Sequence, residues 1–295
     1  MLYIDMEDKD IFNRINNLMP KLSKGQKKLA NYILSSYDKA AHMTAARLGE
    51  VTGVSESTVV RFAVSLGYEG YPQLQKDLVH SSLNRMNSLQ RIEIASDSLK
   101  SEDVLTKVLQ SDADKIKETL ILMDNDSFQK AVDSICIAQK VYVIGVRSSS
   151  LLAQTLAFYL NLMFDHVILL DNNNPGDLFE QMIHMDLRDV LLAFSFPRYS
   201  KRTQTACKYA HECKAKVITI TDSPTSPLEE YADYSLVAKS DMISIVDSLV
   251  APLSVINALV VAISVKKQAM VSETFKKLES IWEQHDFYDQ SGDLT

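Results

Sequence analysis

The sequence predicts an α/β protein made of an all-α head followed by a doubly wound, five-stranded parallel-sheet domain. Helical periods dominate the first part of the chain, and no strand-like alternation of apolar and polar residues appears before residue 140. Beyond that point, short apolar runs alternate with helical patterns, which is typical of a parallel sheet covered on both faces. The length of 295 residues leaves room for two such domains.

The head is predicted to begin with two helices. The first, over residues 10–19, places its apolar side chains on one face and ends at Pro20. The second begins at Ser23, which forms a capping-box pattern with Gln26 three residues later. Residues 81–102 are rich in Ser, Asn and charged residues with weak periodicity, and they therefore predict a linker.

Residues 43–71, MTAARLGEVTGVSESTVVRFAVSLGYEGY, carry the most specific pattern in the chain. Thr44 is placed to cap one short helix, and Gly53 supplies the left-handed turn residue after it. Ser55 is placed to cap a second helix, which Gly67 stops. This spacing predicts a helix-turn-helix. The positions expected to face inward or to lie at the helix crossing are Leu48, Gly49, Val51, Val59 and Phe62.

The second helix of such a unit enters the major groove of DNA with its N-terminal residues against base edges. Arg61 can clamp a guanine, and Glu56 can accept from a cytosine. The alternative is an ordinary helical hairpin with short polar side chains, which the agreement of caps, turn glycine and inward positions disfavours. One unit makes few contacts, so specific binding to a double-stranded DNA operator predicts a homodimer or homotetramer. The predicted DNA-binding residues are Thr44, Ser55, Glu56, Ser57, Thr58 and Arg61.

From residue 140 onward, five apolar runs predict the strands of the sheet: VYVIG, HVILLD, DVLLAFSF, KVITITD and YSLVA. Two helices, over residues 103–122 and 126–138, precede the first strand. We expect the first of these helices and the C-terminal helices within residues 246–284 to supply contacts between subunits. In a doubly wound sheet, ligands bind at the carboxyl ends of the strands.

Polar and cationic residues follow two of these strands. Gly145, Arg147 and three serines lie between the first strand and a helix, whose free N–H groups attract an anion. The segment PRYSKRT after the third strand adds further cations. Each loop alone is also compatible with a capped turn or a solvated basic loop, and Thr221, Asp222 and Ser223 after the fourth strand are compatible with sugar-hydroxyl binding or turn formation. The first two loops together predict an anion site made by Gly145, Arg147, Ser148, Ser149, Ser195, Arg198 and Ser200.

At these motifs the chain resembles a known family. Residues 8–85, above all LGEVTGVSESTVVRFAVSLGYEGYPQLQKDL, are similar to the head of the MurR/RpiR transcriptional regulators, and residues 125–265 resemble a sugar isomerase (SIS) domain. The resemblance implies a repressor or activator whose DNA binding responds to a phosphorylated sugar. The chain departs from the family's Gly-x-Gly-x-Ser and Ser-x-Ser-Gly-x-Thr loops, where Arg147 and Arg198 replace glycines. Either the arginines clamp the anion, or they block its pocket, or the ligand differs from the usual hexose phosphate.

Two other functions are compatible with parts of the sequence. A sugar-phosphate isomerase-like enzyme with an accessory helical domain needs a base, for which Glu180 and His184, four apart on a predicted helix, are candidates. A surface position suits this pair better, and two side chains are too few for a metal site. A DNA-bound architectural protein without a ligand has no use for the cationic rim. We therefore expect a regulator and not an enzyme, with no catalytic residue, no metal and no cofactor.

Charge is unevenly distributed along the chain. Residues 1–85 carry 11 Lys and Arg against 9 Asp and Glu, a net +2, whereas the whole chain carries −7, so the remainder carries −9. The head is therefore the better candidate for binding a polyanion. The sequence shows no signal peptide, no unbroken apolar stretch of membrane-spanning length and three Cys without ligand spacing, which predicts a cytoplasmic protein with no membrane partner. The predicted domains are residues 1–85 for DNA binding, 86–124 as linker and connecting helix, and 125–284 for phosphosugar binding and dimerisation.

Overall fold

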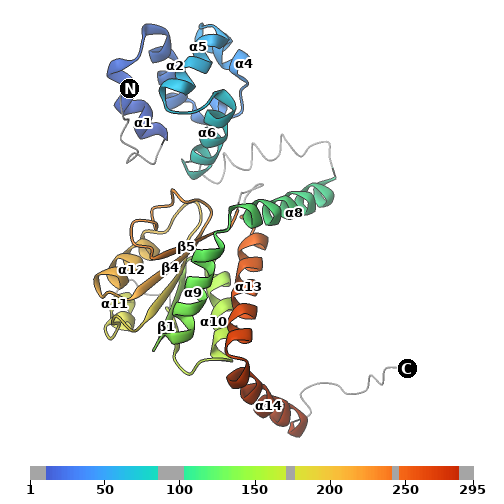
Figure 1. The fold of residues 1–295 in the computed structure, drawn as a ribbon. Coiled ribbons are helices and arrows are strands. Elements are labelled where there is room, and N and C mark those ends of the chain that lie inside the picture. Colours follow the sequence, from blue (N-terminus) through green and yellow to red (C-terminus); the bar gives the residue numbers. More distant parts are fainter. Residues whose placement is uncertain (1–10, 86–102, 171–176, 241–245, 286–295) are drawn as a thin grey trace. The chain divides into compact units, whose positions relative to one another are not determined.

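The computed structural model describes residues 11–85, 103–170, 177–240 and 246–285. Its contacts divide the chain into two compact units, Met1–Ser101 and Glu102–Thr295 (Figure 1). The predicted class is confirmed, because a helical first unit precedes a five-stranded, all-parallel sheet with helices.

The first unit consists of short helices around one apolar core. The predicted capping box starts α2, where the side chain of Ser23 accepts from the N–H of Gln26 and the side chain of Gln26 accepts from the N–H of Ser23. The last helix continues to Arg85, so residues 81–85, which were expected in a linker, are helical. The elements are α1 (Ile11–Leu18), the 3-10 turn η1 (Met19–Lys21), α2 (Lys24–Ser35), α3 (Tyr37–Ala40), α4 (Ala45–Thr52), α5 (Glu56–Ser65) and α6 (Tyr71–Arg85).

Helices α4 and α5 form the predicted helix-turn-helix. Gly53 follows α4 with a φ of 68°, the left-handed conformation that the turn needs. Gly49 allows the close approach to the next segment, since a Cβ there would lie 2.8 Å from the carbonyl oxygen of Val54. The expected inward position of Val51 is wrong, because its side chain is 39 % exposed. The buried face of α4 centres on Leu48 and Gly49, and Val51 lies beyond its edge.

The sheet of the second unit has the strand order β2-β1-β3-β4-β5, and all neighbouring strands are parallel. Strands β1 and β3 are neighbours, with Gly145 opposite Phe194. The loops that follow these two strands therefore lie next to each other at the carboxyl edge, where the chain order reverses and ligands of such sheets bind. All five predicted strands are present: β1 (Val141–Gly145), β2 (Val167–Leu169), β3 (Val190–Phe194), β4 (Lys216–Thr221) and β5 (Tyr234–Val237).

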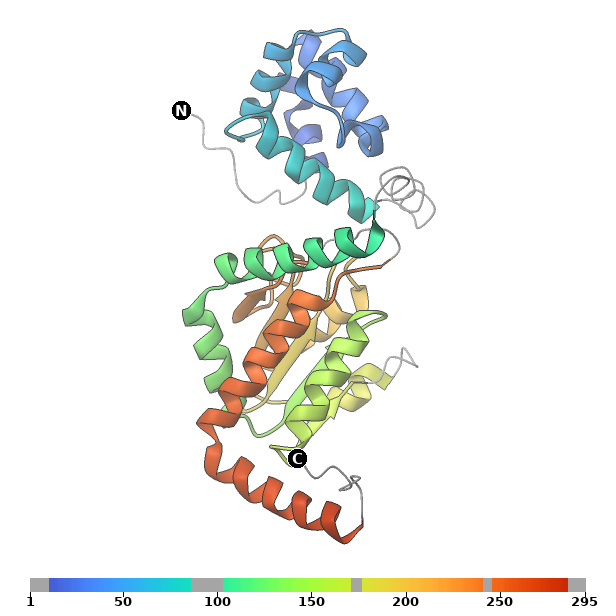
Figure 2. The same ribbon diagram turned by 90° about the vertical axis from the view of Figure 1, so that its right-hand side faces the viewer.

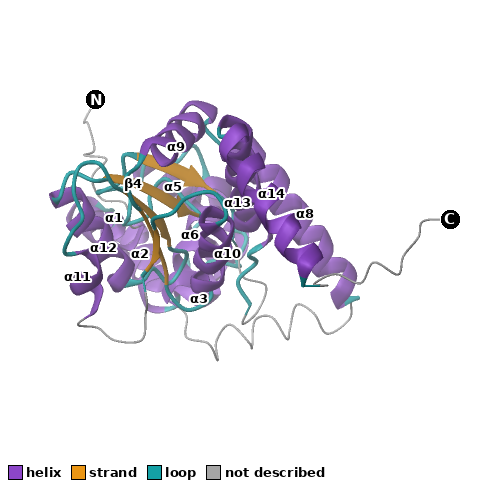
Figure 3. Cartoon of the chain, turned by 90° about the horizontal axis from the view of Figure 1, so that it is seen from below, coloured by secondary structure: helices purple, strands orange, loops and turns teal. Residues whose placement is uncertain are grey.

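Helices cover both faces of the sheet (Figure 3). Because successive strand residues point to opposite faces, Val141 and Val143 of β1 pack in the core formed with α9, α10 and α13. Tyr142 and Ile144 pack on the other face in the core formed with α11 and α12. The helices are α8 (Val104–Leu122), α9 (Asn125–Ile137), α10 (Ser149–Asn161), α11 (Asp177–Met182), α12 (Lys201–Glu212), α13 (Val250–Lys266) and α14 (Gln268–Gln284).

Helix α13 carries apolar side chains on its outer side as well as on the side that packs in the core. Ile256, Leu259 and Ile263 are buried, whereas Val261 and Val265 are 60 % and 71 % exposed. Helix α8 crosses one end of α13, and α14 leaves the other end (Figure 2). Within the described ranges, no single helix is long and apolar enough to cross a membrane; α13 and α14, bent by 99° relative to each other, reach that length and composition only as a pair.

Candidate functional site

The first turn of α5 carries side chains predicted to contact DNA. Ser55 takes the N-cap position in the backbone, but its hydroxyl hydrogen-bonds the hydroxyls of Ser57 and Thr58, both at 2.9 Å. The expected side-chain cap at Ser55 is therefore wrong, because neighbouring hydroxyls compete for the same oxygen. Thr44 does cap α4, since its Oγ1 accepts from the N–H of Arg47 at 3.3 Å.

Arg61 lies one turn further along α5 and is exposed. Its Nε donates to the carbonyl oxygen of Ser57 at 3.3 Å, and its Nη2 donates to Thr58 Oγ1 at 3.4 Å. Both bonds are long and involve neutral acceptors, so the guanidinium can leave them for a base edge at little cost. With Glu56 also exposed, α5 offers a cation, a carboxylate and hydroxyls, which are the groups that read base edges in the major groove.

The first anion loop joins β1 to α10. Gly145 packs directly under the start of α10, since a Cβ there would lie 2.2 Å from the carbonyl oxygen of Ser149. Arg147 has a φ of 58°, in the left-handed region that favours glycine. This conformation costs an L-residue about 1–2 kcal/mol. The loop therefore keeps a glycine-type backbone where the family pattern has a glycine, and it carries a guanidinium group there.

Ser148 connects this loop to the segment before α13. Its hydroxyl donates to Oδ2 of Asp247 at 3.0 Å. The next residue, Ser248, donates to Oδ1 of Asp112 on α8 at 2.5 Å, and its carbonyl oxygen accepts from the hydroxyl of Ser240 at 2.8 Å. Asp247 and Asp112 were not predicted as site residues, because nothing in the sequence pairs them with serines far along the chain.

The second anion loop joins β3 to α12. Ser195 is buried, and its hydroxyl accepts from the N–H of Ser200 at 3.2 Å. Ser200 caps α12 as expected, by accepting from the N–H of Thr203 at 3.4 Å. Tyr199 donates to Oδ1 of Asp222 at 2.9 Å. Burial, and then the charge of Asp222, raise the pKa of Tyr199 well above its usual range, so its hydroxyl stays protonated and holds this loop to the one after β4.

The seven predicted anion-site residues divide into two groups. Those that reach the surface are Arg147, Ser148, Arg198 and Ser200, and those that are buried are Gly145, Ser149 and Ser195. The buried ones fix the backbones of the loops. The guanidinium groups of Arg147 and Arg198 make no ion pair or hydrogen bond with any residue that the structure describes. Two cations with no counter-ion among the described residues, on loops that follow neighbouring strands, make this edge of the sheet the candidate anion site.

The pair of side chains considered for an isomerase does not share a helix. Helix α11 ends at Met182, so Glu180 lies on it and His184 lies beyond it. Both side chains are exposed. The prediction that Glu180 and His184 lie on the same helix is therefore wrong.

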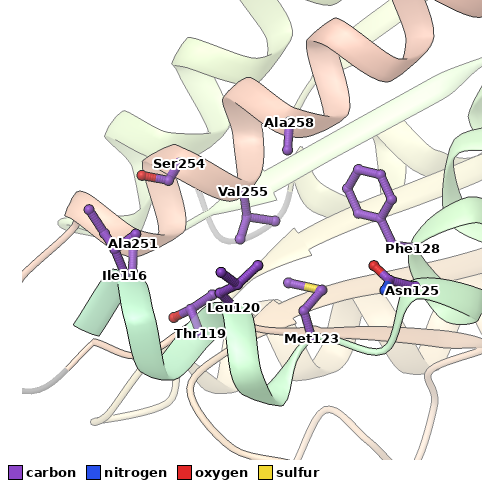
Figure 4. Close-up of a pocket in the computed structure, with 10 residues that line it drawn as sticks. All are labelled: Ile116, Thr119, Leu120, Met123, Asn125, Phe128, Ala251, Ser254, Val255 and Ala258. Atoms are coloured by element: carbon purple, nitrogen blue, oxygen red, sulfur yellow. The ribbon is translucent and has the colours of Figure 1, made fainter. Parts of the chain in front are cut away.

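A separate cavity of about 250 Å³ lies between α8, the start of α9 and α13 (Figure 4). Its lining is mostly apolar and, among the residues that the structure describes, includes no charged side chain, so a phosphate there would lose hydration without gaining a cation. This cavity is therefore not the anion site. It is lined by Ile116, Thr119, Leu120, Met123, Asn125, Phe128, Ala251, Ser254, Val255 and Ala258.

Two family models match the chain: a helix-turn-helix domain of the rpiR family over residues 9–84, and a SIS domain over residues 134–262. The HTH-type transcriptional regulator HexR of Escherichia coli (strain K12) is 24 % identical over 295 residues, which cover 97 % of this chain and 99 % of HexR. An uncharacterised HTH-type transcriptional regulator of Haemophilus influenzae is 28 % identical over 231 residues, which cover 77 % of this chain and 79 % of the relative.

Solved structures share the fold. The NanR protein of Vibrio vulnificus, complexed with ManNAc-6P, is 22 % identical with a TM-score of 0.58, over 93 % of this chain and 98 % of NanR. The sugar isomerase domain of an RpiR transcription factor from Sphaerobacter thermophilus is 24 % identical with a TM-score of 0.58, over 61 % of this chain and 99 % of that domain. Both of these relatives carry the name of HTH-type transcriptional regulator, which favours a regulator over the isomerase alternative. The chain therefore belongs to the RpiR family of transcriptional regulators, with a helix-turn-helix domain followed by a SIS domain.

Proposed function

We propose that this regulator binds a double-stranded DNA operator through its head, and that a phosphorylated sugar bound after β1 and β3 controls this binding. The observation that carries the proposal is the pair of exposed guanidinium groups of Arg147 and Arg198, which have no counter-ion among the described residues. Residues 1–85 serve as the DNA-binding domain and residues 125–284 as the phosphosugar-binding and dimerisation domain. Residues 86–124 join the two.

The chemistry of the two loops suits a phosphate monoester. Such a group carries nearly two negative charges at neutral pH, and a guanidinium matches two of its oxygens in a bidentate pair. The glycine-type φ of Arg147 leaves the loop backbone in place beneath that side chain. NanR, which shares the fold, is complexed with the phosphorylated sugar ManNAc-6P, and this supports the same class of ligand here.

Control requires that the ligand make different contacts in two states of the protein. The hydroxyl of Ser148 is already bound to Asp247, so a phosphate on this loop competes with a carboxylate for the same donor. The segment that carries Asp247 also binds Asp112 of α8 through Ser248. Helix α8 follows the head along the chain. When the phosphate replaces Asp247 as the acceptor of the Ser148 hydroxyl, the segment of Asp247 and Ser248 is released. This change can pass to α8, which connects to the head.

Dimerisation rests on the outer side of α13. Val261 and Val265 are largely exposed in a single chain, and exposed apolar side chains that lie together on one helix face often mark a contact with another protein chain. A second copy of the chain placed on α13 covers this surface and gives two heads for two half-sites. Analytical ultracentrifugation at micromolar concentration tests this, since a strict monomer contradicts it.

Removing one guanidinium from the anion site is expected to weaken ligand binding about 10- to 150-fold, because a hydrogen-bonded pair with a charged group contributes about 1.5–3 kcal/mol. The variants are Arg147→Gly, which keeps the left-handed φ without strain, and Arg198→Ala. A thermal-shift screen of wild-type protein against hexose, pentose and N-acetylhexosamine phosphates, including ManNAc-6P, first selects the ligand. Isothermal titration calorimetry then measures its affinity for each variant.

Arg188→Ala is the matched control for these variants. Arg188 is an exposed arginine of the same unit, but it pairs with Asp186 at 2.5 Å before β3, at the other edge of the sheet. Its loss is expected to leave ligand affinity unchanged. If Arg147→Gly and Arg198→Ala bind the ligand as tightly as Arg188→Ala does, the two arginines do not hold the anion and this site assignment is wrong.

Ser248→Ala is expected to uncouple ligand from DNA while leaving each binding step intact. The substitution removes the bond to Asp112 but none of the exposed groups of the anion loops. Coupling between two sites is typically about 1–3 kcal/mol, or 5- to 150-fold in affinity. We expect most of the ligand-induced change in operator affinity to disappear, as measured by fluorescence anisotropy with and without saturating ligand.

Ser264→Ala is the control for this variant, because the hydroxyl of Ser264 donates within its own helix, to the carbonyl oxygen of Val261 at 2.8 Å. It is expected to keep the full ligand response. An unchanged response in Ser248→Ala as well means that ligand binding reaches the head by another route.

A further inference from the structure

The first helices of the head carry many positive charges and no negative ones. Residues 11–37 contain five basic residues and no Asp or Glu. One of them, Arg14, is engaged inside the unit, where its guanidinium contacts Tyr68. The other four are exposed, and their ammonium groups make no ion pair or hydrogen bond with the described residues. They are Lys21, Lys24, Lys27 and Lys28.

This charge lies beside the recognition helix. A Cβ added at Gly25 of α2 would lie 3.5 Å from Val54 Cγ1 and 3.7 Å from Thr58 Cγ2, so the first turn of α2 packs on the first turn of α5. Lys24 precedes Gly25, and Lys28 lies three residues after it on a neighbouring position of the helix surface. Both lysines therefore lie next to the point where α2 packs on the first turn of α5. That turn is the part of α5 that is predicted to meet base edges.

We infer that Lys24 and Lys28 bind the phosphate backbone at the side of the groove that α5 enters. The inference rests on the proposed function, in which α5 reads the operator. The major groove is about 12 Å wide, and a helix with its side chains is about 10–12 Å across. A helix packed beside the one that lies in the groove therefore meets the phosphates along the edge of the groove. The flexible point charge of lysine suits such a contact.

Phosphate contacts of this kind fix the position of a protein on the duplex but read no sequence. Lys24 and Lys28 are thus positioning residues, and Arg61 is the sequence-reading cation. Their effects differ in kind. Loss of a lysine weakens binding to every duplex and lowers its dependence on salt, whereas loss of Arg61 weakens binding to the preferred sequence.

The experiment uses the full-length chain with Lys24→Gln, with Lys28→Gln and with both. Affinity is measured by fluorescence anisotropy over a range of NaCl concentrations. The probes are a duplex of arbitrary sequence and a duplex that the wild-type protein selects from a random library. We expect the slope of log affinity against log salt to fall by about 0.9 for each phosphate that is no longer neutralised. Both duplexes are expected to lose affinity to the same extent.

Lys39→Gln is the matched control. Lys39 is exposed and, like the two lysines, pairs with none of the described residues, but it lies on α3 beyond the opposite end of α2, a helix of 12 residues. That length corresponds to about 18 Å. Its substitution is expected to leave the salt slope at the wild-type value. Thermal unfolding of all variants should match wild type, because these ammonium groups form no ion pair or hydrogen bond with the described part of the chain.

If Lys24→Gln and Lys28→Gln keep the same salt slope as Lys39→Gln, the inference is wrong. That result differs from a failure of the proposed function. If the proposed function is wrong, the wild-type protein selects no duplex from the library and binds all sequences with equal affinity, whatever the lysine variants do.

Discussion

Arg61→Ala is expected to abolish most of the preference of this regulator for its operator. Arg61 is an exposed cation of α5, and long bonds to Ser57 and Thr58 hold it weakly in the free protein. A bidentate arginine–guanine pair contributes about 1–3 kcal/mol of discrimination. Because the pair would be missing from each of two heads, operator affinity should fall about 30-fold or more. The measurement compares the library-selected duplex with a scrambled duplex at one fixed salt concentration.

Arg47→Ala separates this effect from a simple loss of charge. Arg47 lies on α4 of the same unit, is exposed and pairs with Glu50 at 2.6 Å. The ratio of the affinity for the library-selected duplex to the affinity for the scrambled duplex should stay at its wild-type value in Arg47→Ala. In Arg61→Ala this ratio should approach one. Equal ratios in both variants mean that α5 does not read sequence through Arg61.

Gly145→Ala is expected to destabilise the SIS domain by about 1–3 kcal/mol or more, the cost of overpacking a tight site. The added Cβ would lie 2.2 Å from the carbonyl oxygen of Ser149 and 3.2 Å from Ala153 Cβ. The start of α10 must therefore move away from β1. For a unit of this size, each kcal/mol lowers the midpoint of thermal unfolding by about 2–4 °C. Differential scanning calorimetry of the full-length protein measures the shift.

Gly70→Ala serves as the control for that measurement. A Cβ at Gly70 would meet only Pro72 Cδ, at an ordinary 3.7 Å, so a small change is expected. An unshifted midpoint in Gly145→Ala contradicts the close packing of α10 on β1. Because the first anion loop leads directly into α10, the variant should also lose affinity for the ligand.

Much of the fold could be predicted because its signals are local. The cap at Thr44, the turn at Gly53 and the capping box at Ser23 each depend on residues within a few positions of one another. The strands are short apolar runs buried on both faces, such as β3, whose five residues are all buried. Patterns of this kind need no knowledge of distant contacts.

The candidate site could be predicted only in part, because its buried and paired groups depend on contacts between distant segments. Ser148 and Asp247 are 99 positions apart, and no spacing rule connects them. Ser195 looks like a ligand-facing hydroxyl in the sequence, yet it is buried and supports the N–H of Ser200. The arginine that replaces a glycine at position 147 leaves its role open in the sequence, and only the structure shows that the backbone there keeps the left-handed φ that favours glycine.

The exposed valines of α13 affect how the folding stability of this protein depends on its concentration in the cell. If Val261 and Val265 are covered only by a second copy, folding and pairing are one equilibrium, and each tenfold dilution costs a dimer about 1.4 kcal/mol. The unfolding midpoint should then rise with protein concentration, and a scarce regulator should be degraded faster than an abundant one. Gene dosage would thereby set the lifetime of the regulator as well as its occupancy on DNA.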